Sequence, residues 1–192
     1  MAVLNPVPEA WLVPVLVRGI LVLLGTMVPG AAQGQTADEY QVKAAYMYNL
    51  AKFVDWPSDA FESPSQPIAF CVLGQTPLSR PLEDALAGKV VGQRPLVFHQ
   101  LSDSNQAGGC RVLFIGLADK IRLRQTLDQV KSLHVLTVGE AADFTGEGGI
   151  VRFFLDEGRV RLEFNLDAAD DAKLRVSSKL LSLGKIVRRV GR

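Results

Sequence analysis

Apolar residues recur at helical spacing in the segment from residue 39 to residue 54. These apolar positions are Val42, Ala45, Tyr46, Leu50 and Phe53. Side chains three or four residues apart share one face of a helix, so the spacing predicts a helix that turns these residues toward the core. Pro57 follows, and because the residue before a proline disfavours the helical conformation, the helix is predicted to end there.

Short apolar runs alternate with amphipathic segments over the middle of the chain. Strands are predicted at 68–74, 89–91, 95–100, 111–116 and 135–138. Helices are predicted between them at 76–87 and 118–132. Such alternation is typical of a largely parallel sheet that is covered by helices on its faces.

The last third of the chain has a different pattern. Residues 150–155 and 159–165 alternate apolar and polar side chains around an Asp-Glu-Gly turn, which predicts a β-hairpin. A helix is predicted from about Asp167 onward, with an apolar stripe of Leu180, Leu183, Val187 and Val190. The predicted fold class is therefore α/β: a single-domain sandwich over residues 39–190, with a central mixed, largely parallel sheet flanked by helices, ending in a β-hairpin and a C-terminal helix.

The N-terminus indicates export from the cytoplasm. Residues 12–28 are nearly all apolar, with Arg18 as the only charge, and small residues follow at Gly30 and Ala32. This pattern predicts a secretory signal peptide over residues 1–32, followed by a flexible mature N-terminus at 33–38. An uncleaved anchor is the alternative, because about 17 apolar residues is the lower limit for spanning a membrane.

Composition and charge narrow the class of partner. Hydrophobic residues make up 48% of 192 residues, which suits one globular domain with its own core. The 21 Lys and Arg residues nearly balance the 20 Asp and Glu residues. A net charge this close to zero gives no long-range attraction for nucleic acid or acidic lipid, so a nucleic-acid partner is not expected.

The chain has two cysteines, Cys71 and Cys110, and both lie in the exported part. In an oxidising compartment an even pair of this kind favours a disulfide. Two buried thiols that pack as small apolar side chains are the alternative.

Most sequence signatures of enzymes are missing. The chain has no glycine-rich phosphate loop, no HExxH and no CxxC motif, and its two histidines, His99 and His134, are isolated from each other. Structural or surface roles are therefore expected for both histidines, and no metal site or cofactor is predicted. Ser182 and Lys185 match the SxxK motif of serine lactamases, but the companion motifs of those enzymes are missing.

Two polar clusters also have simple structural explanations. Residues 146–149 read Gly-Glu-Gly-Gly, and their backbone amides can form a nest for an anion, although a flexible loop is the favoured interpretation. Asp167, Asp170 and Asp171 lie near a predicted helix start, where the helix dipole favours acidic residues without any reaction. Neither cluster predicts catalysis.

Aromatic residues crowd the segment from 46 to 57. Tyr46 and Phe53 lie on the predicted apolar face of the helix and are assigned to the core. Tyr48 falls on another face, and Trp56 follows the helix end, so these two residues are the candidate contacts with a partner protein.

Several stretches of this chain resemble the YfiR family of periplasmic proteins. They are YMYNLAKFVDWP, CVLG, CRVLFIG and GGIVRFFLDEGRVRLEFNLDAADDAKLRVSSKLLSLGKIV. The resemblance covers the chain from about Tyr40 to Val187 and keeps the family's order of motifs. It implies a compact α/β sandwich, a structural disulfide between Cys71 and Cys110, no catalytic activity and a periplasmic location.

The resemblance also implies a regulatory function. Members of the family bind the periplasmic region of an inner-membrane diguanylate cyclase and hold it inactive, which keeps cyclic-di-GMP and biofilm formation low. It further implies an outer-membrane lipoprotein that sequesters the repressor, and a homodimer. This chain lacks the second cysteine pair that some members carry in the late hairpin region.

Two other functions compete with repression of a cyclase. One is a periplasmic small-molecule sensor or solute-binding module with a cleft at the strand ends. The other is an envelope hydrolase that uses Ser182 and Lys185.

Overall fold

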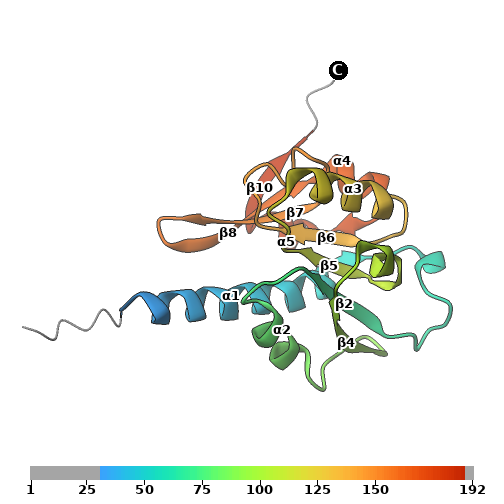
Figure 1. Ribbon diagram of the computed structural model, residues 1–192. Coiled ribbons are helices and arrows are strands. Elements are labelled where there is room, and N and C mark those ends of the chain that lie inside the picture. The colour runs from blue at the N-terminus through green and yellow to red at the C-terminus, as the bar shows by residue number, and fades with distance from the viewer. Residues whose placement is uncertain (1–30, 189–192) are drawn as a thin grey trace, which may run out of the picture.

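One eight-stranded sheet organises the chain (Figure 1). The structure is a computed structural model that describes residues 31–188, with side chains from residue 37 onward. The strands of this sheet are β2 (Ile68–Leu73), β3 (Val90–Val91), β4 (Arg94–Leu101), β5 (Val112–Ile115), β6 (Leu136–Gly139), β7 (Val151–Asp156), β8 (Arg159–Asn165) and β10 (Gly184–Val187). Their order across the sheet is β10-β8-β7-β6-β5-β2-β4-β3.

Most of this sheet is parallel, as the strand and helix alternation predicts. Only the β3–β4 and β7–β8 ladders are antiparallel, because a two-residue turn joins the strands of each pair. The other five ladders are parallel. A separate antiparallel pair is formed by β1 (Val54–Asp55) and β9 (Arg175–Val176). The predicted fold class is confirmed as a mixed, largely parallel sheet flanked by helices.

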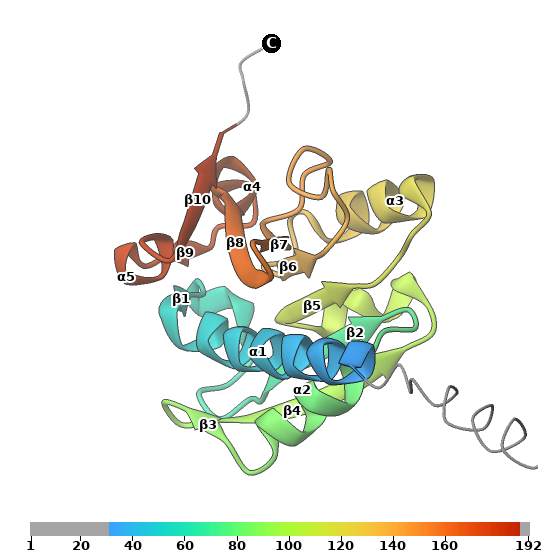
Figure 2. The same ribbon diagram turned by 90° about the vertical axis from the view of Figure 1, so that its left-hand side faces the viewer.

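Helices pack on both faces of the sheet (Figure 2). The α-helices of the described residues are α1 (Ala31–Phe53), α2 (Ser79–Leu86), α3 (Lys120–Val130), α4 (Leu166–Asp171) and α5 (Ser178–Leu181), and the 3-10 helices are η1 (Ser58–Ala60) and η2 (Ser104–Gly109). Apolar residues of α1 and α2 belong to one core cluster, whereas those of α3 belong to a second cluster on the opposite face.

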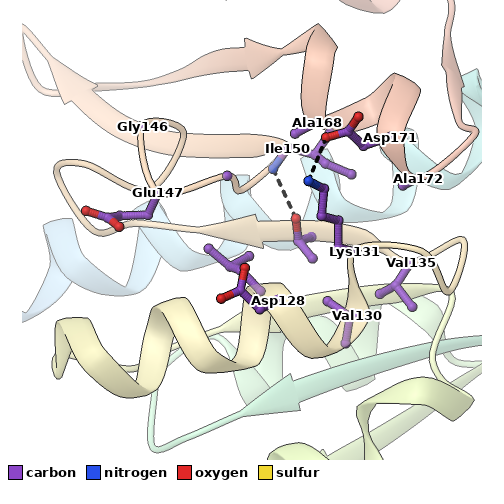
Figure 3. A pocket seen from close by; sticks show the side chains of 13 residues that line it. Asp128, Val130, Lys131, Val135, Gly146, Glu147, Ile150, Ala168, Asp171 and Ala172 are labelled. Atoms are coloured by element: carbon purple, nitrogen blue, oxygen red, sulfur yellow. Dashed lines mark hydrogen bonds and ion pairs between the residues drawn. The ribbon is translucent and has the colours of Figure 1, made fainter. Parts of the chain in front are cut away.

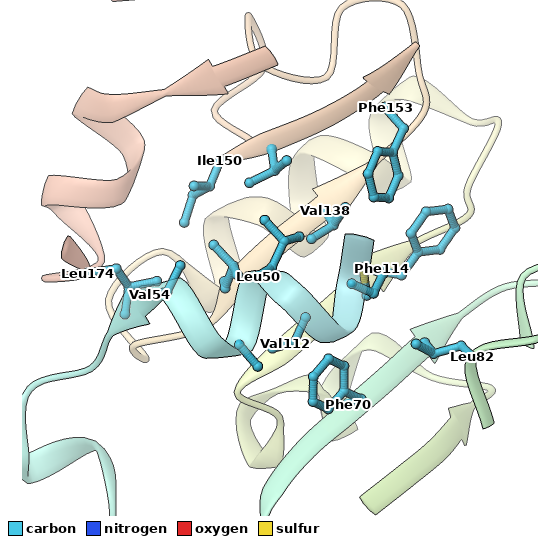
Figure 4. Close-up of a cluster of buried hydrophobic side chains, with 14 of the residues drawn as sticks. Leu50, Val54, Phe70, Leu82, Val112, Phe114, Val138, Ile150, Phe153 and Leu174 are labelled. Atoms are coloured by element: carbon cyan, nitrogen blue, oxygen red, sulfur yellow. The ribbon is translucent and has the colours of Figure 1, made fainter. Parts of the chain in front are cut away.

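The central strands supply side chains to both clusters. Phe70 and Val72 of β2 belong to the cluster under α1, which also holds Leu50 and, beside each other in Figure 4, Val54 and Leu174. The alternate residues Cys71 and Leu73 belong to the cluster under α3. Burial on both faces explains why these strands are continuous apolar runs in the sequence.

The disulfide between Cys71 and Cys110 is present, so the prediction of a bridge is confirmed. Cys71 lies in β2, and Cys110 lies two residues before the neighbouring strand β5. Their Cα atoms are 5.9 Å apart, across a sequence separation of 39. Both cysteines are 1% exposed. Closing a loop of this length contributes roughly 4 kcal/mol to stability on the chain-entropy model.

The buried face of α1 differs from the predicted one. The face that packs on the sheet carries Ala44, Met47, Leu50 and Ala51. Leu50 is buried as predicted. Val42, at 44% exposure, and Ala45 are also predicted to be buried, but both are exposed. The reason is Lys43, which is only 3% exposed because two carboxylates pair with it, so a charged residue lies on the buried side.

Helix α1 also begins earlier than predicted, at Ala31. It therefore includes residues 33–38, the segment predicted to be flexible. Almost all of the predicted signal peptide, residues 1–30, lies outside the described residues.

The predicted C-terminal helix is wrong. The structure has two short helices, α4 and α5, and then strand β10, which pairs in parallel with β8. The apolar stripe of the sequence is not continued on one helix: Leu180 is a buried residue of α5, Leu183 is exposed between α5 and β10, and Val187 ends β10. Val190 lies outside the described residues. Gly184 permits the pairing, because a Cβ there would meet the Leu162 carbonyl oxygen at 2.6 Å and the Phe164 ring at 2.7 Å.

We expect Gly184→Ala to lower the free energy of unfolding by about 1–3 kcal/mol, because the added methyl group has no space beside β8. Urea unfolding of the purified protein measures the loss. Gly109→Ala is the matched control, since no atom lies within 4 Å of the position of its Cβ. A Gly184→Ala protein as stable as the control would contradict the pairing of β10 with β8.

Candidate functional site

Tyr48 lies on the flank of α1 that faces away from the β7–β8 hairpin. The ring of Tyr46 is 6.2 Å from that of Phe153 on β7, and Phe53 lies beside Lys179 of α5, with 5.3 Å between the ammonium and the ring centroid. Successive helical residues turn by about 100°, so Tyr48 points to the other flank, toward α2. Tyr48 is half-buried, and Lys52 lies 5.3 Å from the centroid of its ring.

Trp56 has a structural contact that the sequence did not indicate. Its Nε1 donates a hydrogen bond to the carbonyl oxygen of His134, at 3.0 Å. Its ring also packs edge-on against Phe61, with 6.3 Å between the centroids. The indole therefore ties the end of α1 to the loop before β6, while part of its surface stays exposed.

Trp56 lines a groove beside the end of α1, which we call the α1-end groove. Lys52, Asp55, Trp56, Phe61, Val91 and Arg94 are among its lining residues. Since Lys52 also lies over the ring of Tyr48, this lysine connects Tyr48 with the groove. The two candidate partner contacts, Tyr48 and Trp56, are thus on the same side of the molecule.

Two arginines hold the floor of the α1-end groove in place. The guanidinium of Arg94 stacks 3.6 Å from the centroid of the Phe61 ring, and its Nη1 donates to the carbonyl oxygens of Ser63 and Gln66. The Nε of Arg111 donates to the carbonyl oxygen of Ala60 at 2.7 Å. The loop that follows α1 is therefore fixed before any partner binds.

Exposed apolar side chains lie at both edges of the sheet, and the sequence analysis did not single them out. Val90 of β3 is 58% exposed next to the α1-end groove. At the other edge, Ile186 on β10 is 46% exposed, and Leu155 near the tip of the β7–β8 hairpin is 53% exposed. The edge positions of Val90 and Ile186 follow from the strand order, which a single sequence does not reveal.

A small cavity of about 180 Å³ lies between α3 and α4 (Figure 3). Its apolar wall includes Val130 and Ile150, and an ion pair between Lys131 and Asp171, at 3.2 Å, joins the two helices beside it. The Gly-Glu-Gly-Gly loop forms another wall, and its Glu147 carboxylate pairs with Lys120 and Arg124 on α3, at 2.7 and 2.5 Å. The hydrogen bonds from Lys120 and Arg124 lower the pKa of the Glu147 carboxyl.

Glu163 is a buried carboxylate in the centre of β8, with 6% of its surface exposed. It accepts hydrogen bonds from the Thr145 hydroxyl at 2.5 Å and from Nε of Arg152 at 3.1 Å, and the Lys185 ammonium lies 3.9 Å away. Burial by itself raises the pKa of this carboxyl, but the bonds from Arg152 and Thr145 outweigh burial and hold its pKa below the usual range. The carboxylate joins the loop before β7 to three strands.

The structure separates Ser182 from Lys185 as catalytic partners. Ser182 ends α5 and donates its hydroxyl to the carbonyl oxygen of Lys179. Lys185 belongs to β10 and points toward Glu163. The two side chains therefore do not lie one helical turn apart, and the arrangement that the SxxK motif requires is not formed.

His134 has structural contacts, whereas His99 is an exposed residue. His134, with a φ of 56°, places Nδ1 3.1 Å from the carbonyl oxygen of Ala172, and its own carbonyl accepts the bond from Trp56. His99 lies on β4. Across residues 31–188, no cluster of three or more His, Cys, Asp or Glu side chains is arranged to hold a metal ion. None of the helices in this range has the length and apolarity needed to cross a membrane.

The fold defines the class of the protein as a single-domain α/β protein with a largely parallel sheet. A family model described as YfiR/HmsC-like matches residues 40–185. The chain therefore belongs to the YfiR/HmsC-like family, a regulatory family. A comparison with curated proteins gives no match.

Solved structures resemble the chain at low identity. A conserved domain protein from Vibrio cholerae O1 biovar El Tor strain N16961 matches with a TM-score of 0.52 at 12% identity, over 78% of this chain and 60% of that chain. The ABC domain from Streptococcus pneumoniae in complex with L-Trp has a TM-score of 0.49 at 8% identity, with the same coverage. This chain thus spans 60% of the length of each, and the Vibrio likeness concerns the fold alone.

We expect Glu163→Gln to lower the free energy of unfolding by about 1.5–3 kcal/mol at pH 7, because charge-assisted bonds to Arg152 become neutral ones. The folded pKa of Glu163 is depressed, so its contribution is present above the unfolded pKa of about 4.3 and is lost as pH falls through the folded pKa. Urea unfolding at several pH values measures both effects.

The stability difference between the original protein and Glu163→Gln should therefore shrink below about pH 4.3. Glu83→Gln is the control, since Glu83 is exposed on α2 and should change stability by less than about 0.5 kcal/mol at any of these pH values. An equally large Glu163 effect at pH 3 and pH 7 would argue against an ionic role.

Proposed function

We propose that this protein is a periplasmic regulator that binds the periplasmic region of an inner-membrane diguanylate cyclase and represses it. Cyclic-di-GMP and biofilm formation would stay low while the complex persists. The observation that carries the proposal is the YfiR/HmsC-like match over residues 40–185. The predicted signal peptide at residues 1–32 supports a periplasmic location, and the disulfide between Cys71 and Cys110 suits an oxidising compartment.

The docking surface in this proposal consists of Tyr48, the α1-end groove and Val90. Tyr48 and Trp56 are half-buried, and Val90 presents an exposed apolar side chain on a two-residue edge strand. Aromatic residues contribute large contact areas and are enriched among the residues that dominate binding energy. Because Arg94 and Arg111 already fix the loop that carries Phe61, little ordering free energy is lost on binding.

Relief of repression belongs to the same proposal. Sequestration by an outer-membrane lipoprotein would compete with the cyclase, and a homodimer would present two docking surfaces to a dimeric target. The near-neutral net charge means that either partner must be recognised by surface contact and not by long-range attraction.

Deletion of the coding sequence should raise cyclic-di-GMP, and the tagged full-length protein should capture a diguanylate cyclase from detergent-solubilised inner membranes. Mass spectrometry of the captured proteins and a nucleotide measurement check the two outcomes. Unchanged cyclic-di-GMP together with capture of no cyclase would refute the proposed function.

Tyr48→Ala should weaken capture of the cyclase by about tenfold or more, because it removes an aromatic ring from the docking surface while leaving the core in place. Tyr48→Phe keeps the ring and should bind as the original protein does. Leu155→Ala is the matched control, since it removes an exposed apolar side chain near the tip of the β7–β8 hairpin, far from β3 in the strand order. If Leu155→Ala weakens binding and Tyr48→Ala does not, the partner binds at the hairpin.

A further inference from the structure

Strands β2 and β5 lie side by side in parallel, yet the chain leaves their carboxyl ends in opposite directions. After β2 the chain enters α2, whose Leu82 packs in the core cluster under α1. After β5 it enters α3, whose Leu127 packs in the cluster on the other face. The strand order therefore reverses at this point, because β4 continues from β2 on one side and β6 continues from β5 on the other.

A crevice opens at this reversal point, as expected for a parallel α/β sheet, where ligands bind outside the carboxyl ends of the strands. Its volume is about 470 Å³, within the range of small-molecule sites. One wall is the turn after β2, with Thr76 and Pro77, and the other is the turn after β5, with Leu117 and Ala118. The space is open to solvent and is bounded on its third side by the residues after β6.

The base of the crevice is made of backbone. Gly74 has a φ of 95°, and a Cβ at this position would lie 2.7 Å from the carbonyl oxygen of Gly116. The Gly116 amide donates to the carbonyl oxygen of Leu73 at 2.8 Å. Glycine at position 74 thus lets the two turns approach each other closely.

A charge cluster lies along the third side of the crevice. Glu140 follows β6 directly, and its Oε1 lies 2.9 Å from the ammonium of Lys43 on α1. Its Oε2 accepts a hydrogen bond from the hydroxyl of Tyr40 at 3.4 Å. Lys43 also pairs with Glu39, and its ammonium lies 4.4 Å from the centroid of the Tyr40 ring.

The ionisation states in this cluster follow from its contacts. Burial by itself lowers the pKa of Lys43, but its bonds to Glu39 and Glu140 outweigh burial and raise the pKa above its ordinary value. Burial and the Glu140 charge raise the pKa of Tyr40, so its phenol is neutral at physiological pH. The cluster holds two carboxylates and one ammonium, for a net charge of about −1.

An incoming ligand meets the negative part of this cluster. The side chain of Lys43 is 3% exposed and is enclosed by its partners, whereas that of Glu140 is 31% exposed. Oε2 of Glu140 accepts one hydrogen bond, from Tyr40, while Oε1 is buried beside the Lys43 ammonium without a hydrogen-bond donor among the described residues, and a carboxylate can accept about four hydrogen bonds. Glu140 therefore has acceptor capacity for a donor that enters from the crevice.

We propose that this crevice binds a small organic cation, in which a primary ammonium group donates to Glu140 and an apolar body lies between Pro77 and Leu117. The buried ion pair of Lys43 supports this assignment, because such pairs contribute little net stability and yet hold a carboxylate in a fixed position. The proposal goes beyond repression of a cyclase and does not depend on it.

The probe is 2-phenylethylamine, titrated calorimetrically into the purified protein, with 2-phenylethanol and phenylacetate as neutral and anionic counterparts of the same size. We expect the amine to bind about tenfold or more tightly than either counterpart, as a charge-assisted bond to Glu140 requires. Glu140→Gln should remove this preference, whereas Glu83→Gln, on exposed α2 surface, should keep it.

A second pair of variants keeps the test decisive if Glu140→Gln does not fold. Ala118 is exposed in the crevice wall, so Ala118→Phe should fill the space and abolish amine binding without disturbing the core. Ala45→Phe adds the same ring at an exposed position of α1 outside the crevice and should leave binding unchanged.

Three results would overturn the proposal: no amine binding up to about 10 mM, phenylacetate binding as tightly as the amine, or unchanged amine binding by Ala118→Phe. None of these results bears on capture of a diguanylate cyclase, which tests the proposed function separately.

Discussion

Burial of the β2–β5 pair on both faces is the constraint on which the rest of the structure depends. Alternate residues of each strand enter opposite core clusters, so neither strand can be solvated and each face requires its own helix. Helices α2 and α3 therefore leave the carboxyl ends toward opposite faces, which opens the crevice between Pro77 and Leu117. The disulfide crosses the same pair, from Cys71 in β2 to Cys110 at the entrance of β5. One strand pair thus determines the two core clusters, the position of the disulfide and the crevice at the carboxyl ends of the strands.

The sequence predicts those elements whose signal is local. The apolar runs of β2 and β5 and the hairpin of β7 and β8 need only their own residues to be recognised, and all four strands occur in the structure. The C-terminal strand β10 is different, because the stripe that includes Leu180 and Val187 also fits a helix. The segment forms a strand and not a helix because it pairs with β8, and because Gly184 has no side chain that would collide with Phe164. Neither reason can be recognised from the residues of the segment alone.

The same distinction applies to the functional residues. The pairing of Cys71 with Cys110 follows from composition and an export signal, so it is predictable without coordinates. The buried face of α1 is not, because one of the two carboxylates that pair with the buried Lys43 is Glu140, a residue from the other half of the chain. Glu163 likewise occupies a polar position of an alternating strand, and it is buried because β10 and the loop of Thr145 cover it. Long-range partners thus decide where the charged residues go.

Helix α1 carries both surfaces that have been assigned a binding role. Tyr40 lines the crevice and Lys43 pairs with Glu140 at its third side, whereas Tyr48 lies about two turns beyond Tyr40, or about 12 Å along the helix axis at 1.5 Å per residue. A ligand in the crevice can change how tightly a partner binds only if the ligand itself binds one conformation of the protein more tightly than another. Since Tyr48 does not line the crevice, such a difference has to arise from a shift of α1 relative to the sheet. Ala44, Met47 and Leu50 of α1 are packed against the sheet with no exposed surface, so any shift must move the helix as a unit.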